Sequence, residues 1–286
     1  MRILIFTDYD LDGAGSALFI KWLYRDKITE LVIVETTEST ISNDFKVRES
    51  MVNMFDKVFV LDLDLNEGQT NIVDKGNVVV IDHHTQHVYN KHLYKNAKVV
   101  IEEFNSCVGL IRDKFGSAAN RTDHQEKLID YIDGYSYTNK PTESLQLNAV
   151  YKTYNNPKTI KFIKAFEGGF RPYSILEKNS IKLHMTKWVE QLSNQVFTGV
   201  IKSYKTVSIF ANFAVGEVAH YIISKHGADI GVVINLDNKT VSFRRSKTSD
   251  VDVSVLSKAF CDGGGSPAAA GGNLTDRFAN LTKDFK

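Results

Sequence analysis

The chain is poor in cysteine and proline. Its 286 residues include two cysteines, Cys107 and Cys261, and four prolines. Because the cysteines lie in different halves of the chain and form no C-x-x-C pair, the sequence excludes a disulfide framework and a zinc knuckle. This cysteine usage is typical of a reducing compartment. We therefore expect a cytoplasmic protein in which both thiols are ordinary small apolar residues.

Long apolar runs and an excess of one charge are also missing. No stretch approaches the ~20 apolar residues of a membrane helix, and the apolar run at 2–6 is too short for a secretion signal. Lys and Arg total 35 against 34 for Asp and Glu, so the chain lacks the basic field that long nucleic acids usually demand. We expect no membrane partner, and we expect any polyanion to be short or held by a local patch.

Five short β-branched runs in the first half predict buried strands, at 2–6, 31–34, 58–61, 78–81 and 98–101. Helix-compatible segments such as 14–27 and 44–55 lie between them. This alternation predicts an α/β domain with an open parallel sheet flanked by helices. Ligands of such sheets bind at the carboxyl ends of the strands, so the residues after each run are the candidates for chemistry.

The second half predicts another domain. The pattern turns helical after Cys107, and the polar stretch YKTYNNPKT at 151–159 contains the clearest break. Strand and helix patterns resume near 205. We expect a metal-binding catalytic domain at 1–157, a helical linker at 158–200 and a second, smaller α/β domain at 201–286 that binds substrate.

The segment TDYDLDG places Asp8, Asp10 and Asp12 directly before Gly13. An EF-hand loop begins in this way, but Phe19 occupies the position of its bidentate glutamate, and a strand rather than a helix precedes the segment. The nucleophile motif of haloacid-dehalogenase-type phosphatases explains Asp10 and Asp12. It leaves the histidines further along the chain without a role.

Acids and histidines follow three of the predicted strands. They are Asp8, Asp10 and Asp12 after the first, Asp62 and Asp64 after the third, and Asp82, His83 and His84 around the end of the fourth. Carboxylates gathered at one edge of a sheet repel one another unless cations are present, and imidazoles complete an oxygen and nitrogen shell suited to Mn²⁺. Two such ions sharing a bridging carboxylate would activate water for attack at a phosphorus centre.

Four motifs occur in a characteristic order: DYDLDG at 8–13, VLDLD at 60–64, IDHH at 81–84 and GGGSPAAAGG at 263–272. In this the chain resembles the DHH phosphoesterases, which include RecJ-type exonucleases and nanoRNases, over nearly its whole length. The resemblance implies a catalytic domain with two divalent ions, foremost Mn²⁺ with Mg²⁺ or Co²⁺ as alternatives. It also implies a DHH-associated substrate domain across a cleft from the metals.

The resemblance further implies roles for single residues. The expected metal ligands are Asp8, Asp10, Asp12, Asp62, His83 and Asp133. His84 would complete the second metal site or contact the scissile phosphate, and Asp82 would orient an imidazole or merely cap the strand end. Asp64 is a ligand or a solvated turn residue. For the family's fourth motif Asp133 is preferred to Asp130, because Gly134 would end the helix there and expose the carboxylate.

The second domain supplies the expected substrate contacts. They are Arg244, Arg245, Gly263, Gly264, Gly265 and Ser266, by resemblance to an arginine-bearing strand and a glycine-rich loop. Ser266 stands where the family commonly has a histidine. We therefore expect the grip on phosphate to depend on Arg244, with Arg245 as a further candidate. His87, like the other histidines outside the motifs, is expected to be a surface or packed residue.

These observations predict a metal-dependent phosphodiesterase acting on short single-stranded oligonucleotides. One alternative is a phosphodiesterase for cyclic or linear dinucleotides. Another is a catalytically silent nucleotide-binding module, which Ser266 would favour. An inorganic pyrophosphatase is disfavoured, because the second half resembles the partner domain of nucleic-acid enzymes. A homodimer is left open.

Overall fold

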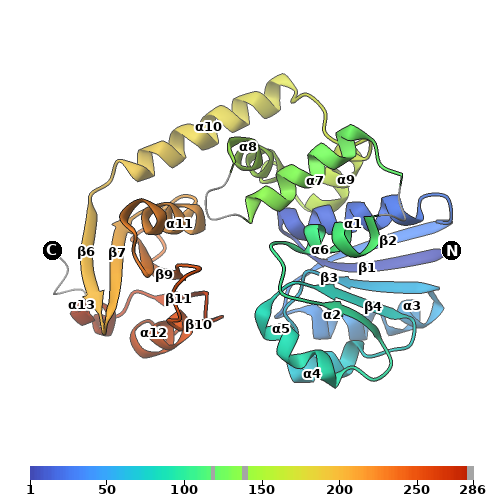
Figure 1. The fold of residues 1–286 in the computed structure, drawn as a ribbon, viewed down its shortest axis with the longest axis horizontal. Helices are drawn as coiled ribbons and strands as arrows, with labels where there is room; N and C mark the ends of the chain where they lie inside the picture. Colours follow the sequence, from blue (N-terminus) through green and yellow to red (C-terminus); the bar gives the residue numbers. More distant parts are fainter. Residues whose placement is uncertain (117–119, 137–140, 282–286) are drawn as a thin grey trace. The chain divides into compact units, whose positions relative to one another are not determined.

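A computed structural model describes residues 1–116, 120–136 and 141–281 of the chain (Figure 1). It divides into two compact units, Met1–Ser180 and Ile181–Lys286. The division falls within α10 (Ile175–Leu192), and the strand β6 (Val196–Ile201) occupies part of the range expected to be a helical linker. Within the described ranges, none of the helices has both the length and the apolar character needed to cross a membrane.

The first unit contains the expected parallel sheet. Its strands are β1 (Arg2–Asp8), β2 (Glu30–Thr36), β3 (Lys57–Leu61), β4 (Val78–Asp82) and β5 (Lys98–Ile101). They lie in the order β2-β1-β3-β4-β5, and every neighbouring pair is parallel. The predicted fold class is confirmed. The order places β1, β3 and β4 side by side.

Helices cover both faces of this sheet (Figure 1). One side carries α1 (Leu11–Tyr24), α6 (Cys107–Phe115), α7 (Asp123–Tyr135), α8 (Thr142–Tyr151) and α9 (Lys158–Phe166). The other carries α2 (Ile41–Val47), α3 (Glu49–Met54), α4 (Glu67–Val73), α5 (Thr85–Asn90) and the 3₁₀ turn η1 (Lys91–Leu93). The sheet is thus buried on both faces, which explains why its strands are almost entirely apolar.

Local capping sets the helix boundaries near the strand ends. α1 begins three residues earlier than expected, because the Asp10 side chain accepts a hydrogen bond from the Gly13 amide at 2.8 Å. The helix expected at 44–55 is broken into α2 and α3 at Arg48, whose φ of −111° is not helical. The Arg48 guanidinium donates to the Asp44 carbonyl at 3.2 Å and so compensates for the broken turn.

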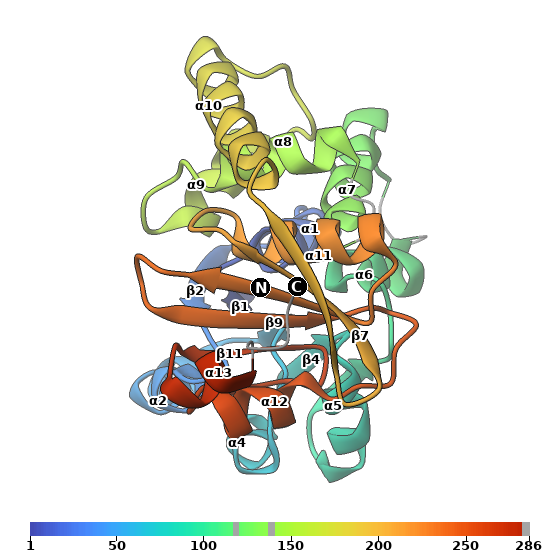
Figure 2. The ribbon, with the colours of Figure 1, turned by 90° about the vertical axis from the view of Figure 1, so that its left-hand side faces the viewer.

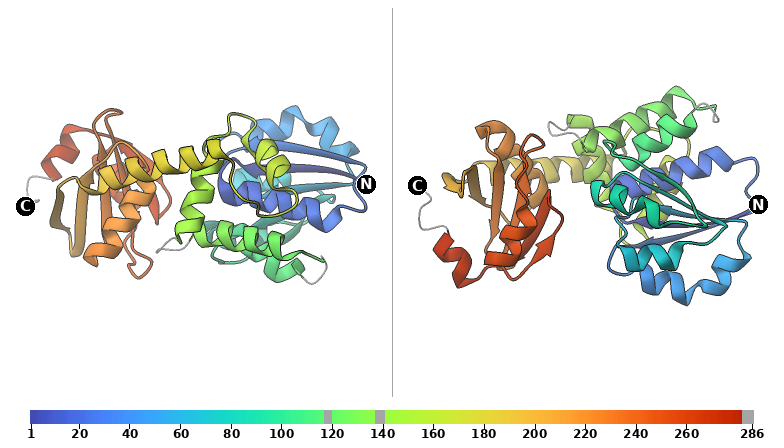
Figure 3. Two further views of the ribbon diagram at one scale, coloured as in Figure 1. Left: turned by 90° about the horizontal axis from the view of Figure 1, so that it is seen from above. Right: turned by 60° about the horizontal axis from the view of Figure 1, so that its bottom comes forward.

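The second unit has a mixed sheet in the order β10-β11-β9-β8-β7-β6. Besides β6, its strands are β7 (Tyr204–Phe210), β8 (Ile230–Asn235), β9 (Thr240–Arg245), β10 (Gly264–Gly265) and β11 (Ala269–Asn273). Only β7 and β8 are parallel, and α11 (Val215–His226) connects them. α11 lies on one face of the sheet and α12 (Val253–Phe260) on the other (Figure 3). α13 (Asp276–Leu281) packs beside α12 (Figure 2).

The glycine-rich motif forms a hairpin rather than an open loop. β10 and β11 pair antiparallel, and β11 continues the sheet beside β9. A Cβ atom at Gly263 would lie 2.0 Å from the Gly271 carbonyl oxygen, and Gly265 has a φ of 139°. Two glycines are therefore required by backbone packing and conformation in this hairpin.

Candidate metal centre

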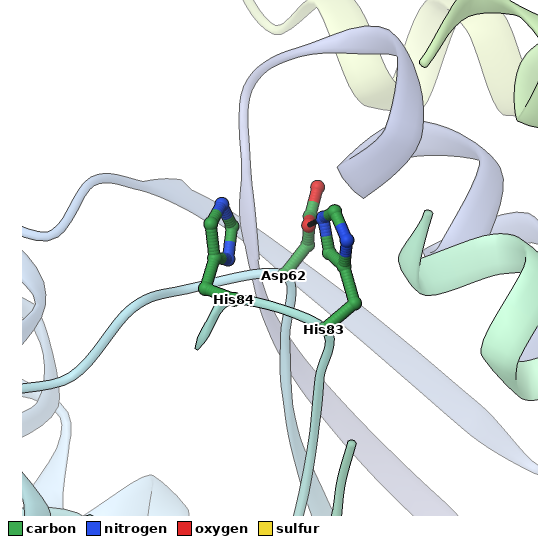
Figure 4. A group of neighbouring side chains, drawn as sticks. All are labelled: Asp62, His83 and His84. Atoms are coloured by element: carbon green, nitrogen blue, oxygen red, sulfur yellow. Dashed lines mark ion pairs between the residues drawn. The ribbon is translucent and has the colours of Figure 1, made fainter. Parts of the chain in front are cut away.

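Three adjacent parallel strands, β1, β3 and β4, end at one edge of the first sheet. Side chains that follow such ends converge outside the sheet. Asp62, His83 and His84 gather there, each with one possible ligand atom within 4.8 Å of the others (Figure 4). The fold thus brings together residues from two of the sequence motifs.

Asp62 lies at the centre of this cluster and is 3% exposed. Its φ of 58°, which aspartate tolerates better than most residues, turns the chain sharply after β3. Asp62 Oδ1 is buried, and no described residue donates a hydrogen bond to it. Burial, together with the charges of Asp12 and Asp10, holds the pKa of Asp62 well above its usual range. A buried carboxylate oxygen without a donor is a position that a cation would satisfy.

His83 presents one nitrogen to Asp62 (Figure 4). Its Nδ1 lies 3.1 Å from the Phe104 carbonyl, to which it donates, so Nε2 faces the carboxylates. Nε2 is 3.3 Å from Asp62 Oδ1 and 3.6 Å from Asp12 Oδ2, close enough for ion pairs but not aligned as a hydrogen bond. Burial lowers the pKa of His83, but Asp62 outweighs it and raises the pKa to about 9. In the metal-free protein a proton is bound to His83 Nε2, the atom at which a divalent ion would bind.

Asp12 is tied to the start of α6. Its two carboxylate oxygens accept hydrogen bonds from the amides of Cys107 at 2.8 Å and Val108 at 2.9 Å. Burial raises the pKa of Asp12 to about 6, although His83 and the two amides oppose the shift. A carboxylate has about four acceptor sites, so two amide bonds leave room for a cation.

Asp8 and Asp10 occupy the rim of the cluster. Asp8 Oδ1 accepts a hydrogen bond from the Tyr9 amide at 2.8 Å, and Asp10 caps α1. Burial, then Asp10 and Glu38, raise the pKa of Asp8 to about 7. Glu38 was not predicted as a site residue. It follows β2, so the rule that strand ends carry the chemistry would have found it if applied to that strand.

Asp82 holds His84. Asp82 is fully buried, and its Oδ1 accepts a hydrogen bond from His84 Nδ1 at 2.8 Å. Burial alone would raise the pKa of Asp82, but His84 and His87 hold it well below its usual range. In turn burial lowers the pKa of His84, and the Asp82 carboxylate outweighs this and raises it well above its ordinary value. Asp64 lies near Asp82 and His87, forming a second group of potential ligand atoms.

Asp133 lies against α6. Its Oδ1 accepts hydrogen bonds from Ser106 Oγ at 2.5 Å and Asn105 Nδ2 at 3.0 Å, and its Oδ2 is 3.4 Å from Arg112. Arg112 also binds Asp130 at 2.6 Å. These contacts stabilise the beginning of the helix that holds Asp12, and none of them is to Asp62 or His83. The expectation that Gly134 ends the helix and exposes Asp133 is wrong, because α7 continues to Tyr135 and Asp133 is buried. A ligand role for Asp133 stays a prediction.

The predicted substrate residues of the second unit separate on opposite faces of its sheet. Because side chains alternate along β9, Arg244 points to the face that carries α11, where its Nη2 would lie 3.7 Å from a Cβ atom at Gly216. Arg245 points to the face of α12 and lies 3.5 Å from the Val251 carbonyl. Burial lowers the pKa of Arg244. A single phosphate would therefore contact only one of the two arginines, because they lie on opposite faces of the sheet.

The glycine-rich hairpin uses several of its own amides. The Gly263 amide donates to the Ser257 carbonyl at 3.3 Å, and the Ser266 amide donates to the Ala269 carbonyl at 2.9 Å. Ser266 Oγ accepts a hydrogen bond from the Ala269 amide at 3.2 Å. Within this hairpin, Gly264 has no atom near the position of an added Cβ. Gly264 and Gly265 pair with Gly271 and Ala270 in the β10–β11 ladder, so the hairpin itself uses much of the expected set of loop amides for phosphate.

The donors of the strand-end cluster fit a divalent metal ion. Carboxylate oxygens and one imidazole nitrogen face each other, and the central oxygen lacks a hydrogen-bond donor among the described residues. This mixed shell suits Mn²⁺ and related ions. The fold and the cluster together define an α/β protein with a divalent-metal site at the carboxyl edge of a parallel sheet.

Comparison with known families identifies the class. Residues 2–134 match the family model described as the DHH family, N-terminal domain. Residues 2–134 are therefore a DHH-family N-terminal domain, which confirms the family that the sequence motifs indicated. No curated protein sequence matches it significantly.

Solved structures share the fold over nearly the whole chain. The pGpG-specific phosphodiesterase PggH from Vibrio cholerae is 13% identical with a TM-score of 0.60, and the match covers 99% of this chain and 96% of that one. An exopolyphosphatase-related protein from Bacteroides fragilis is 14% identical with a TM-score of 0.53, covering 98% and 91%. RecJ from Thermus thermophilus, in complex with Mn²⁺, is 12% identical with a TM-score of 0.54, covering 99% and 51%.

Proposed function

We propose that the protein is a Mn²⁺-dependent phosphodiesterase that hydrolyses short single-stranded oligonucleotides, dinucleotides included. The observation that carries the proposal is Asp62 Oδ1, a buried carboxylate oxygen without a described donor that faces His83 Nε2 at 3.3 Å. Divalent ions bound at this cluster supply an activated water and neutralise the charge of the attacked phosphate.

Different residues of the first unit are proposed to bind the metal ions and the scissile phosphate. Asp62, Asp12 and His83 hold a cation at the centre, and Asp8 and Asp10 extend the carboxylate shell at the rim. His84 is the more exposed of the two imidazoles, with 40% of its side chain accessible against 17% for His83. Its Nε2 therefore faces outward, either to the second ion or to the scissile phosphate.

Arg244 is the proposed anchor for a phosphate that is not cleaved. The Arg244 guanidinium lies on the α11 face with its Nη1 on the Phe243 carbonyl at 2.8 Å, and burial lowers its pKa. A cation partly removed from water gains more from an anionic ligand than a solvated one does. Gly264, which has open space at the position of a Cβ atom, is the loop residue with room for this phosphate.

The preference for short substrates rests on charge. The chain carries a formal net charge of +1, so additional phosphates of a long strand would gain little attraction. A single anchoring arginine suits a substrate with one phosphate besides the scissile one. The likeness to PggH, described as a pGpG-specific phosphodiesterase, favours a linear dinucleotide among these short substrates.

A silent nucleotide-binding module is the less favoured function. Burial raises the pKa of Asp8, Asp12 and Asp62 in the metal-free protein, so keeping these carboxylates together destabilises the fold unless a cation joins them. A module that only binds nucleotides would gain nothing from this destabilisation of the fold.

The test is hydrolysis of labelled oligonucleotides of graded length, from the dinucleotide upward, beside cyclic dinucleotides, with Mn²⁺. The rate should be highest for the shortest linear substrates. A rate that rises with length and falls steeply with salt would instead indicate an enzyme that tracks long strands. Binding without turnover of any substrate would favour the silent module.

A further inference from the structure

A chain of hydrogen bonds leads away from the proposed site into the interior of the first unit. His84 Nδ1 lies 2.8 Å from Asp82 Oδ1, and the other oxygen, Asp82 Oδ2, lies 2.8 Å from His87 Nδ1. His87 Nε2 lies 2.7 Å from the Tyr94 hydroxyl. Asp82 and His87 are fully buried, while His84 is partly exposed. The chain therefore joins an accessible imidazole to His87 and Tyr94, which belong to none of the sequence motifs.

The chemistry of the four groups sets the direction of each bond. The Asp82 carboxylate can only accept, so both histidines donate their Nδ1–H to it. In the tautomer with its proton on Nδ1, His87 has a lone pair on Nε2 that can accept from the Tyr94 hydroxyl. Burial raises the pKa of Tyr94, which keeps its hydroxyl protonated. His84 likewise donates its Nδ1–H to Asp82, so Nε2 on the outward side of the ring is the nitrogen that can exchange its proton for an ion.

His84 depends on this chain for its orientation. Its side chain is 40% exposed, and the one described ring neighbour is His83, with ring centroids 4.5 Å apart. Packing alone therefore restrains the imidazole weakly. Asp82 can hold the ring only if its own carboxylate cannot rotate, and the bond from His87 to Oδ2 prevents that rotation.

We propose that His87 and Tyr94 are positioning residues that fix the ring orientation and tautomer of His84 through Asp82, so that His84 Nε2 can bind a divalent ion. The proposal rests on the proposed function for the identity of the ion and deepens it. It assigns a role to a histidine that lies outside every sequence motif and was expected to be a surface or packed residue.

Two other roles for His87 fit the contacts less well. A packing role would need only an apolar side chain, whereas both ring nitrogens of His87 are paired in a fully buried position. A metal site formed by Asp64, Asp82 and His87 would have ligand atoms within 4.8 Å. It would have to break the 2.8 Å bond between His87 Nδ1 and Asp82 Oδ2, and His87 has no access to solvent.

The experiment compares four variants of the full chain. His87→Leu removes the donor to Asp82, whereas His87→Asn places an amide nitrogen near the position of Nδ1 and can restore it. Tyr94→Phe removes the outer donor. His92→Leu is the matched control, because His92 is an exposed histidine in the adjacent turn η1, with Nδ1 on the Tyr89 carbonyl at 2.8 Å. Circular dichroism establishes that each variant is folded.

The first readout is Mn²⁺ affinity by titration calorimetry, and the second is kcat and KM on a linear dinucleotide. His87→Leu should weaken Mn²⁺ binding by about 10- to 100-fold, the range for loss of a residue that orients a ligand. It should lower kcat with little change in KM. His87→Asn should recover most of the loss, Tyr94→Phe should show a smaller loss, and His92→Leu should match wild type.

Wild-type Mn²⁺ affinity in folded His87→Leu overturns the proposal, whether or not the protein hydrolyses nucleotides. If the leucine variant does not fold, Tyr94→Phe decides instead, because unchanged affinity together with unchanged kcat in that variant also overturns the proposal. Failure of the wild type to cleave any nucleotide would contradict the proposed function alone, because the affinity comparison remains valid.

Discussion

Raising the pH should destabilise the protein when no metal is present. Several carboxyl groups of the cluster hold their protons to a higher pH in the folded chain than in the unfolded chain. They are Asp8, Glu38, Asp12, Asp62 and Asp64. The folded state therefore binds more protons than the unfolded state above pH ~4, and its free energy of unfolding falls as the pH rises.

Asp12 sets a scale for the effect. Its pKa is about 6 in the folded chain against a usual value of 3.8. Linkage then gives a loss of about 1 kcal/mol in the free energy of unfolding between pH 5 and pH 7 from this group. For a unit of this size that corresponds to about 2 to 4 °C in Tm. The lowered pKa of Glu177, to about 2, lies below this interval and does not offset the loss.

The assay is thermal unfolding at pH 5, 6 and 7 in chelator and in saturating Mn²⁺. In chelator the Tm should fall with pH, and the Asp12→Asn variant should show a shallower slope. In Mn²⁺ the Tm should be higher, and the gain should grow with pH because metal binding requires deprotonated ligands. A metal-free Tm that stays constant or rises from pH 5 to pH 7 would refute the reasoning.

Three further outcomes are expected. Asp62→Asn should lower kcat by orders of magnitude. It should not lower the metal-free Tm, because asparagine tolerates the φ of 58° and removes a buried charge. A lower Tm by calorimetry would count against this. Arg244→Ala should raise KM by about 10- to 100-fold with little change in kcat, the range for a charge-assisted hydrogen bond. Arg245→Ala, on the other face of the sheet, should leave KM near wild type, and equal effects of the two substitutions would contradict the assigned anchor. Turnover should fall as oligonucleotide length increases, measured with labelled strands at fixed salt.

Much of the first unit could be predicted because its signals are local. The five strands are short β-branched runs between helical segments, and a parallel sheet places their carboxyl ends at one edge. The meeting of Asp62 with His83 follows from the adjacency of β3 and β4. Glu38 follows β2 in the same way, so the rule that site residues follow strand ends would also have predicted it.

Other features depend on tertiary contacts that no local pattern encodes. The pairing of His87 with Asp82 and Tyr94 arises where α5 and the segment after η1 pack together. Asp133 meets Ser106 only because α7 packs on α6. The β6 strand has an irregular burial pattern at the sheet edge, and the β10 and β11 hairpin is too rich in glycine to be predicted as strand.

The most direct test of the account is release of mononucleotides from a linear dinucleotide by the wild type and by Asp62→Asn, each in Mn²⁺ and in excess chelator. Only the wild type in Mn²⁺ should release product, because Asp62 supplies the buried oxygen that a cation would satisfy. Undiminished product release in chelator, or from the Asp62→Asn variant, would contradict a metal centre built on this carboxylate.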